Sequence, residues 1–200
     1  MLSFSSFMKL SGSYQINLEK QKVWEALNDP EILKQAIPGC EEFIKNSDTE
    51  FTAKATNKIG PFNASFTGEI ELGDLDPPNS YKISGSGNSP VGFASGEAMV
   101  KLEDYENGTK LIYEVQANVG GKIAQVGSRL IDMTAKKMAD IFFGKFSKLI
   151  SKDESQSKEN VEDNEESLKK LIEENKRPSQ KILIYLAATA GVAILFFLIF

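Results

Sequence analysis

Histidine, the most common general base in enzymes, is missing from all 200 residues of this chain, and Cys40 is its single cysteine. The absence of histidine excludes Ser-His-Asp and Cys-His nucleophile systems. Cys40 has no imidazole to activate its thiol, and a lone cytosolic cysteine is usually a small buried apolar residue. A zinc site built by this chain alone is not expected either. We therefore predict no catalytic residue and no metal site.

Two further groups of polar residues could suggest chemistry. The glycine-rich segment 86–96 is only superficially similar to a phosphate-binding loop, because it lacks the lysine of that motif and leads into a strand instead of a helix. The acidic residues Asp74, Asp76, Glu97 and Glu103 lie in or beside predicted turns, where solvated surface is the expected role. We therefore predict no active site at the glycine-rich segment or at these acidic residues.

A candidate docking surface follows the Gly120-Gly121 pair. Lys122, Gln125 and Arg129 come directly after these glycines and are polar or basic. Small residues with exposed basic neighbours can receive a partner protein, but glycine before a helix is also ordinary turn chemistry. We predict partner docking at these three residues, with a plain turn as the alternative.

The composition restricts the class of partner. The net charge is -5, and no Lys/Arg cluster falls within the predicted folded part, so we predict no binding to nucleic acid. A single cysteine fits a reducing compartment. About 150 residues remain for folding once the polar and apolar C-terminal segments are set aside, which is enough for one domain.

Elements that could position these residues follow from the periodicity. Apolar residues alternate from Leu10 to Leu18, which predicts a strand. Segments 19–29 and 30–37 have helical spacing, with Asn17 and Asp29 as the expected N-caps. Further alternating runs predict an antiparallel meander with one apolar face, at 51–56, 62–72, 81–86, 98–102 and 111–119.

A long helix is predicted from Lys122 to Ile150. Its expected apolar stripe consists of Ile123, Val126, Leu130, Thr134, Met138 and Ile141. Four more apolar residues widen this stripe, namely Ile131, Phe142, Phe146 and Leu149. A helix of this length needs a broad apolar surface to cover, and the meander offers one.

The C-terminal segment 182–200 contains no charged residue and would span roughly 28 Å as a helix, close to the thickness of a bilayer core. Lys176, Arg177 and Lys181 precede it, which predicts a single-pass C-terminal anchor in the cell membrane with the folded domain in the cytoplasm. We expect a flexible extension at 1–7, one domain at 8–150 and a charged polar linker at 151–181.

Three segments resemble the G-subunit family of carbon monoxide dehydrogenase, within the START-like superfamily. They are WEALNDPEILKQAIPGCE at 24–41, IGPFNASFTGEIELGDLDPPNSYKISGSG at 59–87 and GGKIAQVGSRLIDMTAKKMADIFFGKF at 120–146. The resemblance implies an α+β helix-grip fold, in which one strand, two short helices, a six-strand meander and a long C-terminal helix follow in order. It also implies an accessory protein of a molybdenum hydroxylase, and it supplies no catalytic motif.

Helix-grip relatives usually hold apolar ligands, so the resemblance implies a cavity between the long helix and the sheet. The expected wall residues are Phe62, Phe66, Tyr113, Val126, Leu130, Met133, Thr134 and Met138. Leu33 and Ile37 are the expected lid. The alternative for all of them is ordinary core packing.

These observations lead to three hypotheses about function. The first is a non-enzymatic, membrane-anchored accessory protein whose cavity binds a hydrophobic small molecule, such as an isoprenoid quinone or another apolar lipid, with no covalent or metal cofactor. The second is a pure recruitment or assembly factor for the dehydrogenase, without a ligand. The third is a cyclase or hydrolase that uses buried carboxylates, and the absence of histidine together with the few acidic core residues argues against it.

Overall fold

A computed structural model describes residues 5–171, with side chains through Ser151. The first strand, β1 (Ser5–Ile16), is followed by two short helices, α1 (Lys20–Leu27) and α2 (Pro30–Ala36). Six strands come next, namely β2 (Cys40–Lys45), β3 (Glu50–Ile59), β4 (Phe62–Asp76), β5 (Ser80–Ser89), β6 (Gly92–Tyr105) and β7 (Gly108–Gly121). A short 3-10 helix, η1 (Lys122–Val126), leads into the long helix α3 (Ser128–Leu171).

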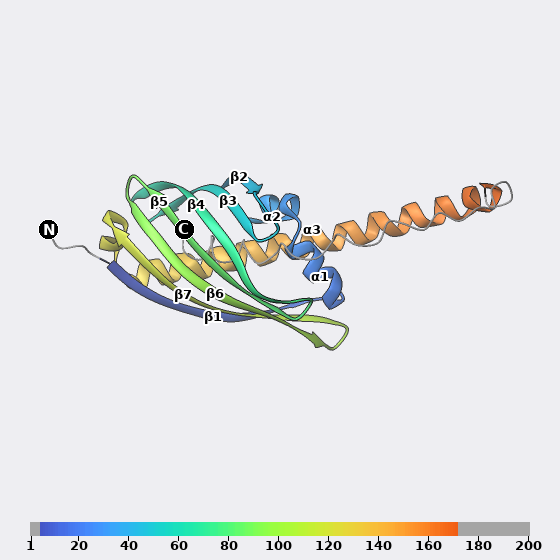
Figure 1. The fold of residues 1–200 in the computed structure, drawn as a ribbon, viewed down its shortest axis with the longest axis horizontal. Coiled ribbons are helices and arrows are strands. Elements are labelled where there is room, and N and C mark those ends of the chain that lie inside the picture. Colours follow the sequence, from blue (N-terminus) through green and yellow to red (C-terminus); the bar gives the residue numbers. More distant parts are fainter. Residues whose placement is uncertain (1–4, 172–200) are drawn as a thin grey trace.

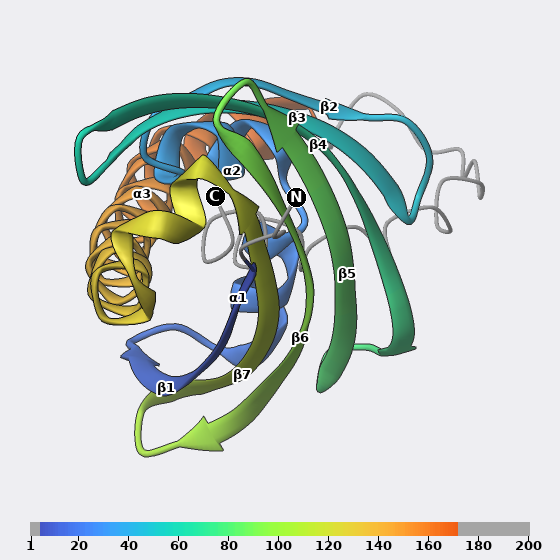
Figure 2. The same cartoon turned by 90° about the vertical axis from the view of Figure 1, so that its left-hand side faces the viewer.

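The seven strands form one antiparallel sheet in the order β1-β7-β6-β5-β4-β3-β2. Strands β2 to β7 are a meander, and β1 joins it by pairing with β7, the last strand in the chain. The sheet curves around α3, with α1 and α2 at one end (Figures 1 and 2). This arrangement confirms the expected α+β fold and its order of elements.

Alternation of apolar and polar residues fixes which side of each strand faces α3. In β4, Phe66, Ile70 and Leu72 are buried on the concave face, while Glu69 and Glu71 are exposed on the outer face. The pairing of Ile70 with Gly85 and of Glu71 with Ser84 carries the same division into β5. A one-residue shift would reverse every side chain, so this pattern specifies the register.

The short helices agree in part with the sequence expectations. Asp29 is the N-cap of α2, and its carboxylate accepts a 2.8 Å hydrogen bond from the backbone N–H of Glu31. Asn17 is not the cap of α1, because that helix begins at Lys20 after Glu19, which makes no side-chain capping hydrogen bond. Trp24 of α1 is only 3% exposed and packs edge-on against Tyr81 of β5, with ring centroids 5.3 Å apart.

The long helix differs from expectation in where it starts and in which face it buries. Gly127, with a φ of 89°, separates η1 from α3, so the helix begins at Ser128 and not at Lys122. Its buried residues are Ile131, Ala135, Ala139, Phe142, Phe143, Phe146 and Ile150. Of the expected main stripe, Ile123 and Val126 belong to η1, and Leu130, Thr134, Met138 and Ile141 lie on the flank of α3. The residues predicted only to widen the stripe include Phe142 and Phe146, which belong to the buried face.

Two domain boundaries need correction, and one prediction lies beyond the described chain. Residues 5–7, expected in a flexible extension, belong to β1 because they pair with 118–120 of β7. Helix α3 continues to Leu171, through most of the predicted linker. The sequence from 145 to 177 contains no glycine or proline, the residues that most disfavour a helix. The predicted anchor at 182–200 lies outside the described residues. Within 5–171, no helix combines the length and apolar character needed to cross a bilayer.

Candidate functional site

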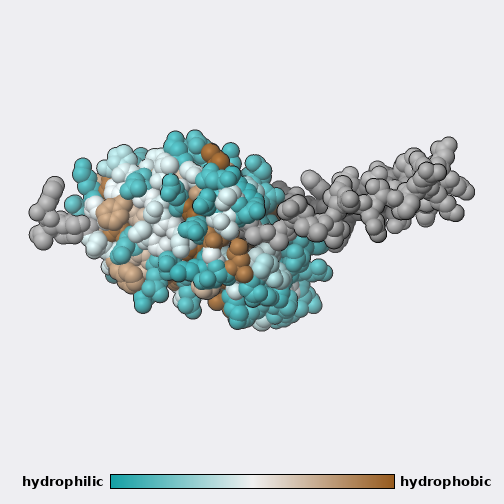
Figure 3. All heavy atoms as spheres, viewed as in Figure 1, coloured by the Kyte–Doolittle hydropathy of each residue, from teal (hydrophilic) through white to brown (hydrophobic). Residues whose placement is uncertain are grey.

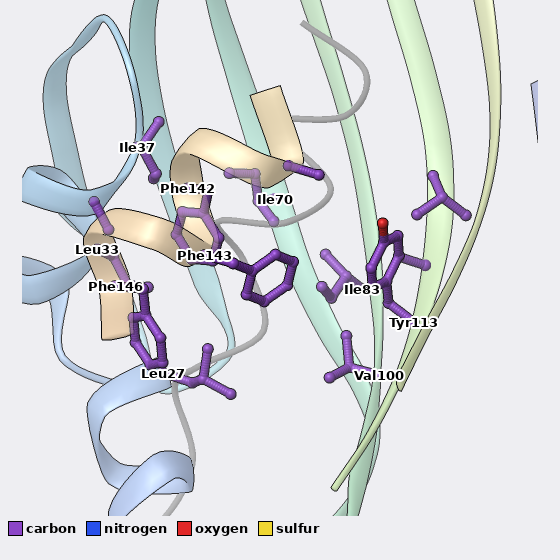
Figure 4. Packing of buried hydrophobic residues seen from close by; sticks show 14 of the residues in the cluster. Leu27, Leu33, Ile37, Ile70, Ile83, Val100, Tyr113, Phe142, Phe143 and Phe146 are labelled. Carbon is purple, nitrogen blue, oxygen red and sulfur yellow. The ribbon is translucent and has the colours of Figure 1, made fainter. Parts of the chain in front are cut away.

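Three aromatic rings meet where α3 approaches β1 and β7. Phe143 of α3 stacks on Tyr14 of β1 with ring centroids 3.9 Å apart, and it lies 5.7 Å from the ring of Tyr113 on β7. Figure 4 shows Phe143 reaching from the helix toward the strands that carry Ile83, Val100 and Tyr113. The cluster of Tyr14, Tyr113 and Phe143, here called the aromatic cluster, therefore lies between the helix and the concave face of the sheet.

Glycine at position 12 makes room for this cluster. Gly12 of β1 is paired directly with Tyr113 of β7, and the Tyr113 ring lies across it. A Cβ atom at position 12 would lie 2.5 Å from the Tyr113 hydroxyl oxygen, closer than Cβ atoms approach any atom in real structures. The absence of a side chain on β1 thus lets the Tyr113 hydroxyl reach the edge of the sheet.

The two tyrosine hydroxyls of the cluster have different partners. Tyr14 donates a hydrogen bond to the Oδ1 atom of Asp140 on α3. The Tyr113 hydroxyl has no hydrogen-bond partner within residues 5–151. Burial, and then the hydrogen bond to Asp140, raises the pKa of Tyr14, while burial followed by the Asp140 charge raises that of Tyr113. Both phenols are therefore protonated donors at neutral pH.

The concave face is less covered along β1 than elsewhere. Leu10, Gly12 and Tyr14 point toward α3 but are only half-buried, whereas the corresponding positions on β7 are fully buried. The boundary between β1 and α3, here called the β1–α3 seam, therefore leaves part of the apolar face accessible.

On the opposite side of α3, the predicted lid residues are closely packed. Leu33 and Ile37 are 0% and 2% exposed and lie beside Phe142 and Phe146 of α3 (Figure 4). The structure thus places these two residues in a closed contact between α2 and α3.

The predicted wall residues do not form one surface. Phe66 and Tyr113 are buried on the concave face, and the half-buried positions are Phe62, Val126, Thr134 and Met138. Leu130 and Met133 are 36% and 61% exposed, so they lie outside the buried face of α3, and their role in a ligand cavity stays a prediction. The buried face of α3 is rotated away from them.

Val126 and Leu130 contact a turn instead of the centre of the sheet. A Cβ atom at Gly60, in the β3–β4 turn, would lie 3.2 Å from Cδ2 of Leu130 and 3.3 Å from Cγ1 of Val126. The Thr134 hydroxyl donates a 2.8 Å hydrogen bond to the backbone oxygen of Leu130, within its own helix. Val126 of η1 and Leu130 of α3 therefore cover the rim of the sheet at the β3–β4 turn.

Sequence reasoning missed Gly12, Tyr14 and Phe143 as site residues. Tyr14 and Gly12 were visible as members of the apolar alternation in the first strand. Phe143 follows Phe142, which was assigned to the widened stripe. No local signal pairs a residue of the first strand with one of the last helix, so their contact depends on the tertiary fold.

A hollow of about 780 Å³ lies on the outer face of the sheet and not between sheet and helix. Its floor includes the paired Gly85 and Gly96, and its walls include the exposed Glu69 and Glu71. It contains none of the predicted wall residues. The face of the molecule seen in Figure 3 is mostly hydrophilic and carries a few apolar patches. This hollow suits polar or basic groups better than an apolar molecule.

The remaining candidates behave as surface or inert groups. Burial raises the pKa of the Cys40 thiol to about 11, so it is protonated at neutral pH and a poor nucleophile. Lys122, Gln125 and Arg129 are exposed on η1 and the first turn of α3, and docking there stays a prediction. In the part of the chain that the structure describes, no three Cys, Asp or Glu side chains are grouped to hold a metal ion.

Comparison with known proteins supports the architecture. A crystal structure of a conserved protein from Geobacillus kaustophilus is 31% identical, with a TM-score of 0.69 over 72% of this chain and 96% of that one. The ZhuI aromatase/cyclase from Streptomyces sp. R1128 has a TM-score of 0.55 at 11% identity, covering 73% of this chain and 94% of its own. The crystal structure of Ara h 8.0201 has a TM-score of 0.53 at 14% identity, and the match covers 74% of this chain and 99% of that one.

These two more distant likenesses show the helix-grip fold and nothing more. No curated relative matches the chain significantly. The family model for the G subunit of carbon monoxide dehydrogenase (CoxG), however, matches residues 12–151, from the middle of β1 to the last described side chain of α3. Since this match covers most of the chain, the protein belongs to the CoxG family, the G-subunit family of carbon monoxide dehydrogenase.

Proposed function

We propose that this protein is a non-catalytic accessory protein of a molybdenum hydroxylase of the carbon monoxide dehydrogenase type. In this proposal it holds an apolar ligand, such as an isoprenoid quinone, against the concave face of its sheet. Family membership supports the accessory role, because the family is named for a subunit of that dehydrogenase. The curved sheet supplies the concave face against which such a ligand would lie.

The accessible β1–α3 seam is the observation that carries this proposal. Leu10, Gly12 and Tyr14 face the helix yet remain half-buried, so part of the concave face stays accessible at this boundary. Ligand sites in proteins are mostly apolar, with a few polar groups that orient the ligand. The aromatic cluster supplies both kinds of contact.

A quinone would suit the role because a dehydrogenase in solution cannot reach an electron acceptor that is confined to the lipid phase. An accessory protein that shields the apolar acceptor would carry it between membrane and enzyme. The uncharged segment 182–200 supports a tether, since its length matches the hydrocarbon core of a bilayer. The tether keeps the carrier close to the pool of acceptor.

Mass spectrometry of organic extracts tests ligand binding. The full chain and its Leu10→Trp variant, in which a larger side chain occupies the seam, would be purified in the same way. Both contain the C-terminal segment, so any lipid that this segment carries is common to the two samples. An apolar molecule enriched in the unmodified protein and depleted in Leu10→Trp supports the proposal. Equal extracts, together with intact binding to the dehydrogenase, would instead favour recruitment without a ligand.

Membrane fractionation tests the tether. The full chain should remain with membranes after a high-salt wash, whereas a chain ending at Lys181 should be released, because the uncharged segment is then missing. Retention of the shortened chain would contradict the proposed anchor.

A further inference from the structure

We infer that the Tyr113 hydroxyl is the polar anchor of the ligand, donating a hydrogen bond to a carbonyl oxygen of an apolar molecule that enters through the β1–α3 seam. This inference rests on the proposed function and adds to it the group that the site recognises. It assigns the ligand to apolar compounds that carry a carbonyl group, and it implies that hydrocarbons without a carbonyl group bind more weakly.

The first argument is the unused hydrogen-bonding capacity of Tyr113. The residue is only 3% exposed, yet its hydroxyl has no partner among the described side chains and backbone. Buried hydroxyls in proteins are nearly always paired. A donor left free in such surroundings is available to a molecule that the structure does not contain.

The second argument is that the hydroxyl is not sealed in. Every fully enclosed side-chain nitrogen or oxygen in the described part of the chain has a hydrogen-bond partner. The unpartnered Tyr113 oxygen therefore retains access to open space. Its ring lies across Gly12 on the edge strand, so that access is at the β1–α3 seam.

The third argument is the contrast with Tyr14, the neighbouring phenol. Tyr14 stacks on Phe143 and gives its proton to Asp140, which links β1 to α3 at this point. That hydrogen bond satisfies Tyr14 and leaves Tyr113 as the free donor of the cluster. Burial raises the pKa of Tyr113, which keeps the proton in place for donation.

The surroundings determine which ligand atoms are recognised. Across the concave face, Tyr113 is in register with Val100 and then Tyr81, and the rings of Tyr14 and Phe143 complete its vicinity. In this proposal a flat apolar ring lies beside these groups, and a carbonyl oxygen at its edge accepts from the hydroxyl. A site built around such a donor rejects analogues that lack the acceptor.

Two probes of the same carbon skeleton separate anchoring from apolar binding. These are 2-methyl-1,4-naphthoquinone, which has two carbonyl oxygens, and 2-methylnaphthalene, which has none. Equilibrium dialysis would measure their binding to the full chain in phosphatidylcholine nanodiscs, with empty nanodiscs as the blank. The variants are Tyr113→Phe, which keeps the ring, and Tyr105→Phe, an exposed tyrosine of β6, as the matched control.

We expect Tyr113→Phe to weaken binding of the naphthoquinone about three- to tenfold, as for the loss of one hydrogen bond, and to leave 2-methylnaphthalene unchanged. Tyr105→Phe should change neither. The infrared carbonyl band of the bound quinone gives a second readout, because a donated hydrogen bond lowers its frequency. That shift should disappear in Tyr113→Phe even if the variant is less stable.

The outcomes distinguish this inference from the proposed function. If both probes bind and Tyr113→Phe changes neither the quinone affinity nor its carbonyl band, the anchor is wrong while ligand binding stands. Loss of both probes alike in Tyr113→Phe, with no carbonyl shift in the unmodified protein, would also overturn the anchor. If neither probe binds the unmodified protein, both the anchor and the proposed quinone site are contradicted.

Discussion

Tyr14 in the first strand and Asp140 in the last helix are joined by a hydrogen bond from the tyrosine hydroxyl to the carboxylate, across 126 positions of the sequence. The bond lies next to the stacked rings of Tyr14 and Phe143, so a polar and an apolar contact hold α3 against β1 at the same place. Replacing Tyr14 by Phe should keep the stacking and lose only the hydrogen bond.

For Tyr14→Phe we expect a loss of about 1 kcal/mol in the free energy of unfolding, because a net hydrogen bond contributes that much and this one is partly exposed. Urea denaturation of the two proteins measures the difference. Asp140→Asn, which keeps an acceptor oxygen, should cost less than Tyr14→Phe. A larger loss of stability in Asp140→Asn than in Tyr14→Phe would show that the charge of Asp140 contributes more to stability than its hydrogen bond with Tyr14.

Alkaline conditions should destabilise the protein. Tyr14, Tyr81 and Tyr113 all have a pKa raised above the ordinary value of 10.0, chiefly by burial. A raised pKa means that the folded state holds the proton more tightly, so this stabilisation is complete below pH 10 and lost as the pH rises further. Denaturation at pH 9 and pH 11 should show the fall, with a smaller fall in Tyr81→Phe.

Gly12→Ala should be destabilising, because its Cβ would lie 2.5 Å from the Tyr113 hydroxyl oxygen. Overpacking of this kind typically costs about 1 to 3 kcal/mol. Gly73→Ala in β4 is the matched control, since no described atom lies within 4 Å of the added Cβ. Thermal denaturation of both variants would test the contrast, and equal losses would contradict the proposed close approach of Tyr113.

Trp24→Ala should cost about 3 to 5 kcal/mol, because the indole is buried and packs against Tyr81. Met133→Ala should change stability by less than about 0.5 kcal/mol, since Met133 is largely exposed on α3. Chemical denaturation gives both values. A large loss of stability in Met133→Ala would show that Met133 is buried, as the sequence predicted.

Cys40 should react slowly with iodoacetamide at pH 8. Burial raises its pKa to about 11, so the reactive thiolate is a small fraction of the thiol at that pH. The rate should rise with pH up to about 11, and at pH 8 it should remain well below that of glutathione. A rate at pH 8 equal to that of glutathione would contradict the raised pKa.

The strands were predictable where alternation is strong, and less so at the edge. In β4 every second residue from Ala64 to Leu72 is buried, and the sequence shows this directly. Strand β2 counted toward the expected six-strand meander but had no predicted position. In its sequence CEEFIK only Phe43 is buried, because this edge strand covers little of the core. Alternation identifies strands only where one face is enclosed.

The face of α3 could not be read from spacing alone. Apolar residues occupy a broad arc of the helix, and periodicity does not tell which part of that arc meets the sheet. The break at Gly127 also separates η1 from α3, so a stripe that continues through both segments has no common face. The contact with Tyr14, which orients Phe143 and Asp140, comes from a strand more than 100 positions away.

The pairing of β1 with β7 also bears on how the chain folds. Met8 is opposite Ala117, so more than 100 residues must be synthesised before these two positions can pair. Contacts between such distant positions slow folding, typically to milliseconds or seconds in sheet-rich domains. During synthesis β1 therefore has no partner strand until β7 has left the ribosome, and an unpaired strand can pair with another chain.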